Sequence, residues 1–133
     1  MTYPEDFDDI IILDAAHFES LTKPVQVATL LHALEAEVNN GGFHQFLTNS
    51  SGYFALQTID ALHAIGAGKT KALLESALRL AYPGGYPNDA ADHEDVPDDD
   101  SLLEAMGELD DSFYRYDDSL TDLVNKYLAS DQT

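Results

Sequence analysis

The chain has 133 residues, the usual size of one domain, and 44% of them are apolar, which is ordinary for a globular protein. It contains no cysteine, which excludes disulfides, zinc–thiolate sites and thiol nucleophiles. Its 25 acids against 6 bases give a formal net charge of −19, which excludes nucleic-acid binding through phosphate neutralisation.

The negative charge is concentrated at the two ends of the chain. Residues 1–19 carry six acids and no base, residues 20–88 carry four of each, and residues 89–133 carry fifteen acids and two bases. A small domain needs a net charge of only about 2–8 for solubility, so the excess points to a function. Because no basic leader and no long apolar run is present, we expect a cytoplasmic protein without a membrane segment.

Helical patterns dominate the first half of the chain. Residues 8–17 predict a short first helix. Pro24 suits the first turn of a second helix, with Thr22 as a possible cap. The apolar stripe of this second helix has spacings of 4, 3 and 4 and consists of Val27, Leu31, Leu34 and Val38. The Asn-Asn-Gly-Gly cluster at residues 39–42 ends that helix, and a short helix follows at 43–49.

Two more helices are predicted before a long loop. One covers residues 54–65 and stops at Gly66, and the next covers residues 69–81. The apolar side of the latter is built on Leu73, Leu74, Ala77, Leu78 and Ala81. Residues 82–100 are rich in Pro, Gly and Asp and predict a surface loop.

The C-terminal segment has the most regular pattern. Its apolar residues alternate spacings of 4 and 3, in the order Leu102, Met106, Leu109, Phe113, Tyr116, Leu120, Leu123 and Tyr127. We expect two helices separated near residues 117–119, because Asp and Ser favour helix caps. The sequence therefore predicts an all-α fold, a single domain over residues 1–133 forming a compact bundle of about six to eight helices.

The stretch VNNGGFHQFLTNSSG, residues 38–52, is the most unusual part of the sequence. Gly41 and Gly42 allow positive φ after a helix, and we expect Gly41 to adopt it. Phe43 and Phe46 are three residues apart and can share one buried face. We interpret the stretch as a structural corner between helices.

Polar residues support the same interpretation. The amides of Gln45 and Asn49 can satisfy backbone groups that two adjacent helix ends leave unpaired, and Gly52 allows a second sharp exit. The alternative is a small polar pocket at the corner, where His44 is the one candidate for acid–base chemistry.

Acids recur opposite the apolar stripe of the C-terminal segment, and they predict an exposed face that binds a partner. Its residues are Asp98, Asp99, Asp100, Glu104, Glu108, Asp111, Asp118 and Asp122. Nineteen charges at one per roughly 1.7 Å correspond to about 32 Å of duplex DNA. That length matches the diameter of a domain whose radius of gyration is about 14 Å.

Metal and nucleotide sites are not predicted. The acidic run at residues 92–100 contains Pro97 and no glycine, unlike a calcium-binding EF-hand loop. The five histidines form no pair at metal-ligand spacing. Residues 66–70, GAGKT, lack the first glycine of a phosphate-binding loop. We expect no metal and no cofactor.

Together these residues resemble the bacterial DNA-mimic protein family. The family's motif is matched by Asn40, Gly41, Gly42, Phe43, Gln45, Phe46, Asn49 and Gly52. Residues 65–67, 83–84 and 109–114 also match, and the resemblance runs from about residue 25 to about residue 130. It implies an all-α fold. In the member that gave the family its name, it also implies an acidic surface that imitates duplex DNA and occupies the DNA-binding face of a transcription factor.

We therefore predict a binding protein and not an enzyme. Its acidic face would compete with DNA for a basic DNA-binding protein, without direct nucleic-acid binding, and the protein would be a monomer or a homodimer. Two alternatives stay open: an immunity or antitoxin-type inhibitor of a basic nuclease toxin, and a small hydrolase that uses the corner and His44.

Overall fold

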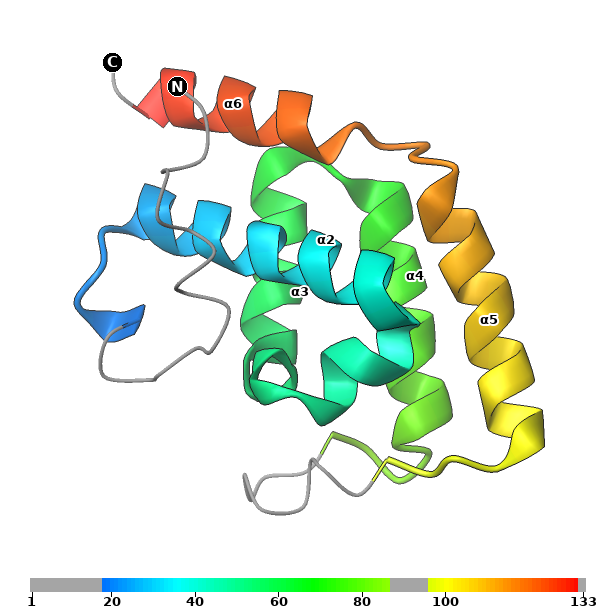
Figure 1. Ribbon diagram of the computed structural model, residues 1–133. Coiled ribbons are helices and arrows are strands. Elements are labelled where there is room, and N and C mark those ends of the chain that lie inside the picture. Colours follow the sequence, from blue (N-terminus) through cyan, green and yellow to red (C-terminus); the bar gives the residue numbers. More distant parts are fainter. Residues whose placement is uncertain (1–17, 87–95, 132–133) are drawn as a thin grey trace.

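The computed structural model describes residues 18–86 and 96–131, and this part of the chain is helical and contains no strand (Figure 1). Its α-helices are α2 (Lys23–Thr48), α3 (Ala55–Ile65), α4 (Gly68–Ala81), α5 (Asp100–Tyr114) and α6 (Leu120–Asp131), with a 3-10 helix η2 (Ser50–Phe54). The predicted all-α class is confirmed. The predicted helix at residues 8–17 and most of the acidic segment 1–19 lie outside the described residues, as do residues 87–95 of the predicted loop.

The five described α-helices are fewer than the six to eight that we predicted. One reason is that the predicted helix at residues 8–17 lies outside the described residues. The other is the corner, because the two helices that we predicted on either side of it form one element, α2, with a kink at Gly41 and Gly42. The residues after the corner also differ from the prediction, because they form the short 3-10 helix η2 before α3 begins.

Helix α2 is central and contacts every other described element. It crosses the hairpin formed by α3 and α4 (Figure 1). The predicted stripe of Val27, Leu31, Leu34 and Val38 is buried, with no member more than 1% exposed. Pro24 lies in the first turn as predicted, whereas the Thr22 side chain makes no capping hydrogen bond.

The remaining helices surround α2. Helix α3 ends at Gly66, whose φ of 80° is left-handed, and the chain turns directly into α4. Helix α5 packs against both α2 and α4. Residues 115–119 separate α5 from α6, which confirms the predicted break, and α6 turns away from α5 to contact α2 and α3 (Figure 1).

Candidate partner-binding surface

The corner changes the direction of α2 at two consecutive glycines. Gly41 has an extended φ of −156°, while Gly42 has a φ of 80°. The expectation of a positive φ at Gly41 is therefore wrong, and Gly42 carries it. Gly41 is restricted by space instead, because a Cβ there would lie 2.0 Å from Gln45 Oε1.

Residues of α5 and the residues just after it form hydrogen bonds with α2 at the corner, although they are distant from it in sequence. An uninterrupted helix would pair the Phe43 N–H with the carbonyl of residue 39. At the kink, the Phe43 N–H instead donates to Asp110 Oδ1 at 2.8 Å. The Tyr114 hydroxyl donates to the Val38 carbonyl at 2.8 Å, and Asn39 Nδ2 donates to the Tyr116 hydroxyl at 2.9 Å. The corner thus sets the position of α5.

Asp110 lies close against the glycine of the kink. A Cβ on Gly42 would be 2.3 Å from Asp110 Oδ2. Burial raises the pKa of Asp110 above 3.8, the hydrogen bond from Phe43 lowers it, the Asp111 charge raises it, and His44 lowers it. The net shift of the pKa is upward, so the folded structure disfavours the ionised form of Asp110 relative to the unfolded chain.

A buried acid that sequence reasoning missed joins the two segments of α2. Glu37 is 6% exposed, and its Oε2 accepts hydrogen bonds from Gln45 Nε2 and Asn49 Nδ2, both at 2.9 Å. The amides were predicted to satisfy backbone groups at helix ends, and this is wrong because they serve Glu37. The sole signal in the sequence was an acid just before the Asn-Asn-Gly-Gly cluster.

Other residues of the motif fill the interior of the corner. Phe43 and Phe46 are fully buried, and the rings of Phe43 and Phe113 form a T-shaped pair with a centroid distance of 5.7 Å. Gly52 is buried and its carbonyl accepts from the Tyr86 hydroxyl, but it has no left-handed φ, so the predicted sharp exit there is wrong. Asn40, by contrast, is exposed.

The candidate acid–base residue of the corner is half-buried. His44 Nε2 is enclosed and makes no hydrogen bond with the described part of the chain. Two hydroxyls close to it in sequence donate to backbone carbonyls, Thr48 Oγ1 to Gln45 at 3.3 Å and Ser51 Oγ to Phe46 at 2.7 Å.

Four of the predicted partner-binding acids form one row on α5. Asp100, Glu104, Glu108 and Asp111 are all exposed, and spacings of 4, 4 and 3 keep them on one helix face over about 16 Å. We call them the α5 stripe. The opposite face carries the buried residues Leu102, Met106 and Phe113. No Lys or Arg lies within Asp100–Tyr114, so the helix has no cation of its own to neutralise the stripe.

The other four predicted acids lie apart from this row. Asp98 is exposed before α5, and Asp99 caps α5 by accepting from the Leu102 N–H at 2.9 Å. Asp118 is half-buried and accepts from the Thr70 N–H at 2.8 Å, at the start of α4. Asp122 is exposed on α6 and accepts from Ser119 Oγ at 3.0 Å. The expected single face is thus divided, because α6 turns away from α5 (Figure 1).

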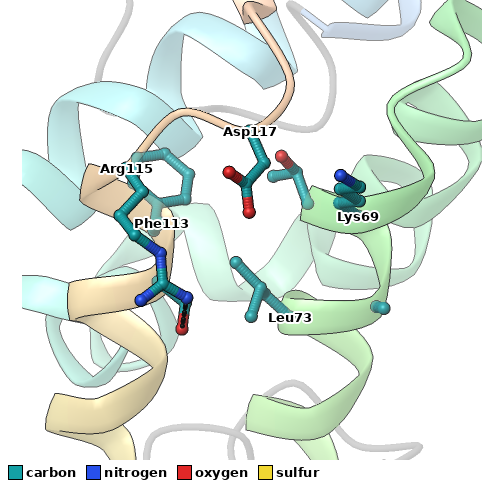
Figure 2. Close-up of a pocket in the computed structure, with 8 residues that line it drawn as sticks. Lys69, Leu73, Phe113, Arg115 and Asp117 are labelled. Carbon is teal, nitrogen blue, oxygen red and sulfur yellow. Dashed lines mark hydrogen bonds between the residues drawn. The ribbon is translucent and has the colours of Figure 1, made fainter.

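A pocket of about 240 Å³ separates the end of α5 from the start of α4 (Figure 2). Leu73 and Phe113 line its wall, with Lys69, Arg115 and Asp117 around it. Arg115 Nη2 donates to Ser112 Oγ at 3.0 Å on this side of α5. The pocket mixes both signs of charge, unlike the α5 stripe.

Metal and membrane features are absent from the described residues. Within residues 18–86 and 96–131, no group of three or more His, Asp or Glu side chains could hold a metal ion. No helix in these same ranges has the length and apolar character needed to cross a membrane.

The comparisons with known proteins assign a family. Searches of curated proteins and of solved structures find no match. The family model described as DMP19-like protein matches residues 19–131, which include the corner and all five described α-helices. The chain therefore belongs to the DMP19-like protein family.

Proposed function

We propose that this protein imitates duplex DNA and occupies the DNA-binding face of a basic protein, such as a transcription factor. The observation that carries the proposal is the α5 stripe, in which four exposed carboxylates follow one another on a helix without a base. The family name, which refers to a DNA mimic protein, supports the same function.

The spacing of the stripe defines what kind of imitation is meant. Neighbouring carboxylates are separated by about 4.5–6 Å along the helix axis. Along the axis of duplex DNA, one strand carries one phosphate per roughly 3.4 Å. Per unit length of axis, the stripe thus carries fewer charges than one phosphate strand, and it would attract Lys and Arg side chains without reproducing each phosphate position.

The fixed position of α5 supports the proposal. Asp110 and Tyr114 of α5, and Tyr116 just after it, connect this end of the helix to α2 at the corner through three hydrogen bonds. A rigid charged row loses little conformational entropy on binding, so more of its electrostatic attraction remains as affinity.

The test is a titration of the basic protein that co-purifies with the wild type from its native host. The variant Glu104→Lys with Glu108→Lys reverses two charges of the stripe. The matched control, Glu19→Lys with Asp60→Lys, makes the same change in net charge at two exposed positions elsewhere. We expect the stripe variant to lose most of its affinity at low salt and the control to keep it, because close charges dominate screened attraction.

Duplex DNA should compete with the protein for the same partner. Equal binding by the wild type and the stripe variant, or a failure of duplex to compete at low salt, would contradict the proposal. If the captured partner is a nuclease that the protein inhibits, the inhibitor alternative takes the place of transcription-factor mimicry.

A further inference from the structure

We infer that Tyr114 and Tyr116, together with Asp111 and Glu35, form a patch that binds arginine side chains of the partner in preference to lysine. The inference rests on the proposed function and adds to it a chemical selectivity that a row of carboxylates lacks. The four residues are called the tyrosine patch below.

Two aromatic rings lie exposed at the end of the stripe. Tyr114 is 44% exposed and Tyr116 is 39% exposed, although both rings also contact the buried Phe113. Tyr114 follows Asp111 by three residues and therefore continues the row of the stripe on α5. Exposed Tyr beside a charged face is typical of the residues that dominate binding energy at interfaces.

Both rings are held in place before any partner arrives. The Tyr114 hydroxyl donates to the Val38 carbonyl, and the Tyr116 hydroxyl accepts from Asn39 Nδ2. These two partners are consecutive residues of α2, so the hydroxyl groups of both tyrosines are anchored at one place. Anchored rings keep their faces available at little entropic cost.

The backbone at Tyr116 is strained. Its φ of 50° makes it the one non-glycine residue with a positive φ in residues 18–86 and 96–131. Gly or Asn would end α5 at this position more favourably. A tyrosine that is kept in such a conformation is consistent with a use for its side chain beyond ending the helix.

Carboxylates flank the rings. Asp111 lies one turn before Tyr114 on α5, and Glu35 lies one turn before Asn39, the residue of α2 that donates to the Tyr116 hydroxyl. Burial and then the charges of Asp110 and Asp111 raise the pKa of Tyr114. Burial raises the pKa of Tyr116, the hydrogen bond from Asn39 lowers it, and the charge of Glu35 raises it. The nearest base in sequence, Arg115, donates to Ser112 beside the pocket (Figure 2). A guanidinium can stack on an aromatic face and pair with a carboxylate at once, whereas an ammonium lacks the planar fork for both contacts.

The test compares two probes of equal charge, a nona-arginine and a nona-lysine peptide, in fluorescence titrations at several salt concentrations. The variant Tyr116→Asn removes a ring and suits the left-handed backbone, so folding should be retained. The control Tyr53→Asn makes the same substitution at a tyrosine of similar exposure, 37%, on η2.

We expect the wild type to prefer nona-arginine. The preference should fall by about two- to fivefold in Tyr116→Asn, as the loss of an exposed cation–π contact implies, and should persist in Tyr53→Asn. Binding of nona-lysine and its salt dependence should stay unchanged in both variants.

Three outcomes would overturn the inference: equal affinity of the wild type for the two peptides, an equal loss of both affinities in Tyr116→Asn, or the same loss of preference in Tyr53→Asn. None of these touches the proposed function, which fails separately if reversing Glu104 and Glu108 leaves binding of both peptides and of the natural partner unchanged.

Discussion

The Asp110 carboxylate accepts a hydrogen bond from the backbone N–H of Phe43 at 2.8 Å, across 67 positions of sequence. One residue belongs to the helix that carries the α5 stripe and the other to the corner of α2. The family-defining stretch and the acidic surface are therefore two parts of one arrangement, in which the corner fixes the charged helix.

Removing the acceptor at this contact should destabilise the protein. In Asp110→Ala the Phe43 N–H loses its partner, which costs about 1–3 kcal/mol of unfolding free energy. Asp110→Asn keeps an oxygen acceptor and should cost less. Urea unfolding measures both, with the exposed neighbour variant Asp111→Ala as control, expected within about 0.5 kcal/mol of wild type. Equal stability of Asp110→Ala and Asp111→Ala would contradict the role of this contact.

Adding a methyl group at Gly42 should be more costly than at Gly66. Both glycines have a φ of 80°, but ψ is −179° at Gly42 and 22° at Gly66. Gly66 is thus in the left-handed helical region, whereas Gly42 is in a region that only glycine adopts readily, so the backbone penalty is also larger at Gly42. Only at Gly42 does the new Cβ meet an atom, Asp110 Oδ2 at 2.3 Å, whereas Gly66 has nothing within 4 Å. Thermal melts of Gly42→Ala and Gly66→Ala give the combined difference, and an Asp110→Ala background isolates its steric part. The difference should shrink in that background, and an unchanged difference there would place the clash elsewhere.

Truncating Phe43 should be among the most damaging changes. The ring is fully buried and packs edge to face on Phe113, so Phe43→Ala should cost about 3–5 kcal/mol. Phe43→Leu keeps most of the volume and should cost distinctly less. Chemical denaturation of the two variants gives the difference. A small effect of Phe43→Ala together with lost partner binding would show that the ring acts in recognition.

Stability should depend on pH through Asp110. Its pKa is raised by burial in the folded protein, so the folded state binds this proton more tightly than the unfolded chain. The stabilising contribution of the protonated form is complete below pH 3.8 and is lost as pH rises through the higher folded pKa. The unfolding free energy of wild type relative to Asp110→Asn should therefore fall as pH rises from about 3.8. A difference that rises with pH over that range would reverse the assigned sign.

Charge reversal on the stripe should leave folding intact. Glu104 and Glu108 are exposed on a helix without a base, so replacing both by Lys lowers self-repulsion. The melting temperature should stay the same or rise, and the gain should shrink at high salt, where charges are screened. A clear drop in melting temperature would mean that these acids stabilise the fold, and lost binding could not then be attributed to the surface.

Local pattern by itself determined the helices of this protein. The apolar stripe of α2, the stop of α3 at Gly66 and the break between α5 and α6 all follow from spacing and cap chemistry, which depend on residues within a turn or two. The same kind of evidence placed a break at the two glycines, although it assigned the positive φ to Gly41 and not to Gly42.

Only the tertiary structure decided which acids remain free to bind. The Glu37 carboxylate accepts hydrogen bonds from two side-chain amides across the kink. Asp110 accepts one from the Phe43 N–H, and Asp118 accepts one from the Thr70 N–H, 48 positions away in the sequence. In sequence these acids look the same as Glu104 or Glu108, because periodicity reports which side of a helix a residue lies on. Whether a carboxylate on that side meets water or an unpaired backbone N–H depends on which helix packs beside it, and that contact is formed only when the chain folds.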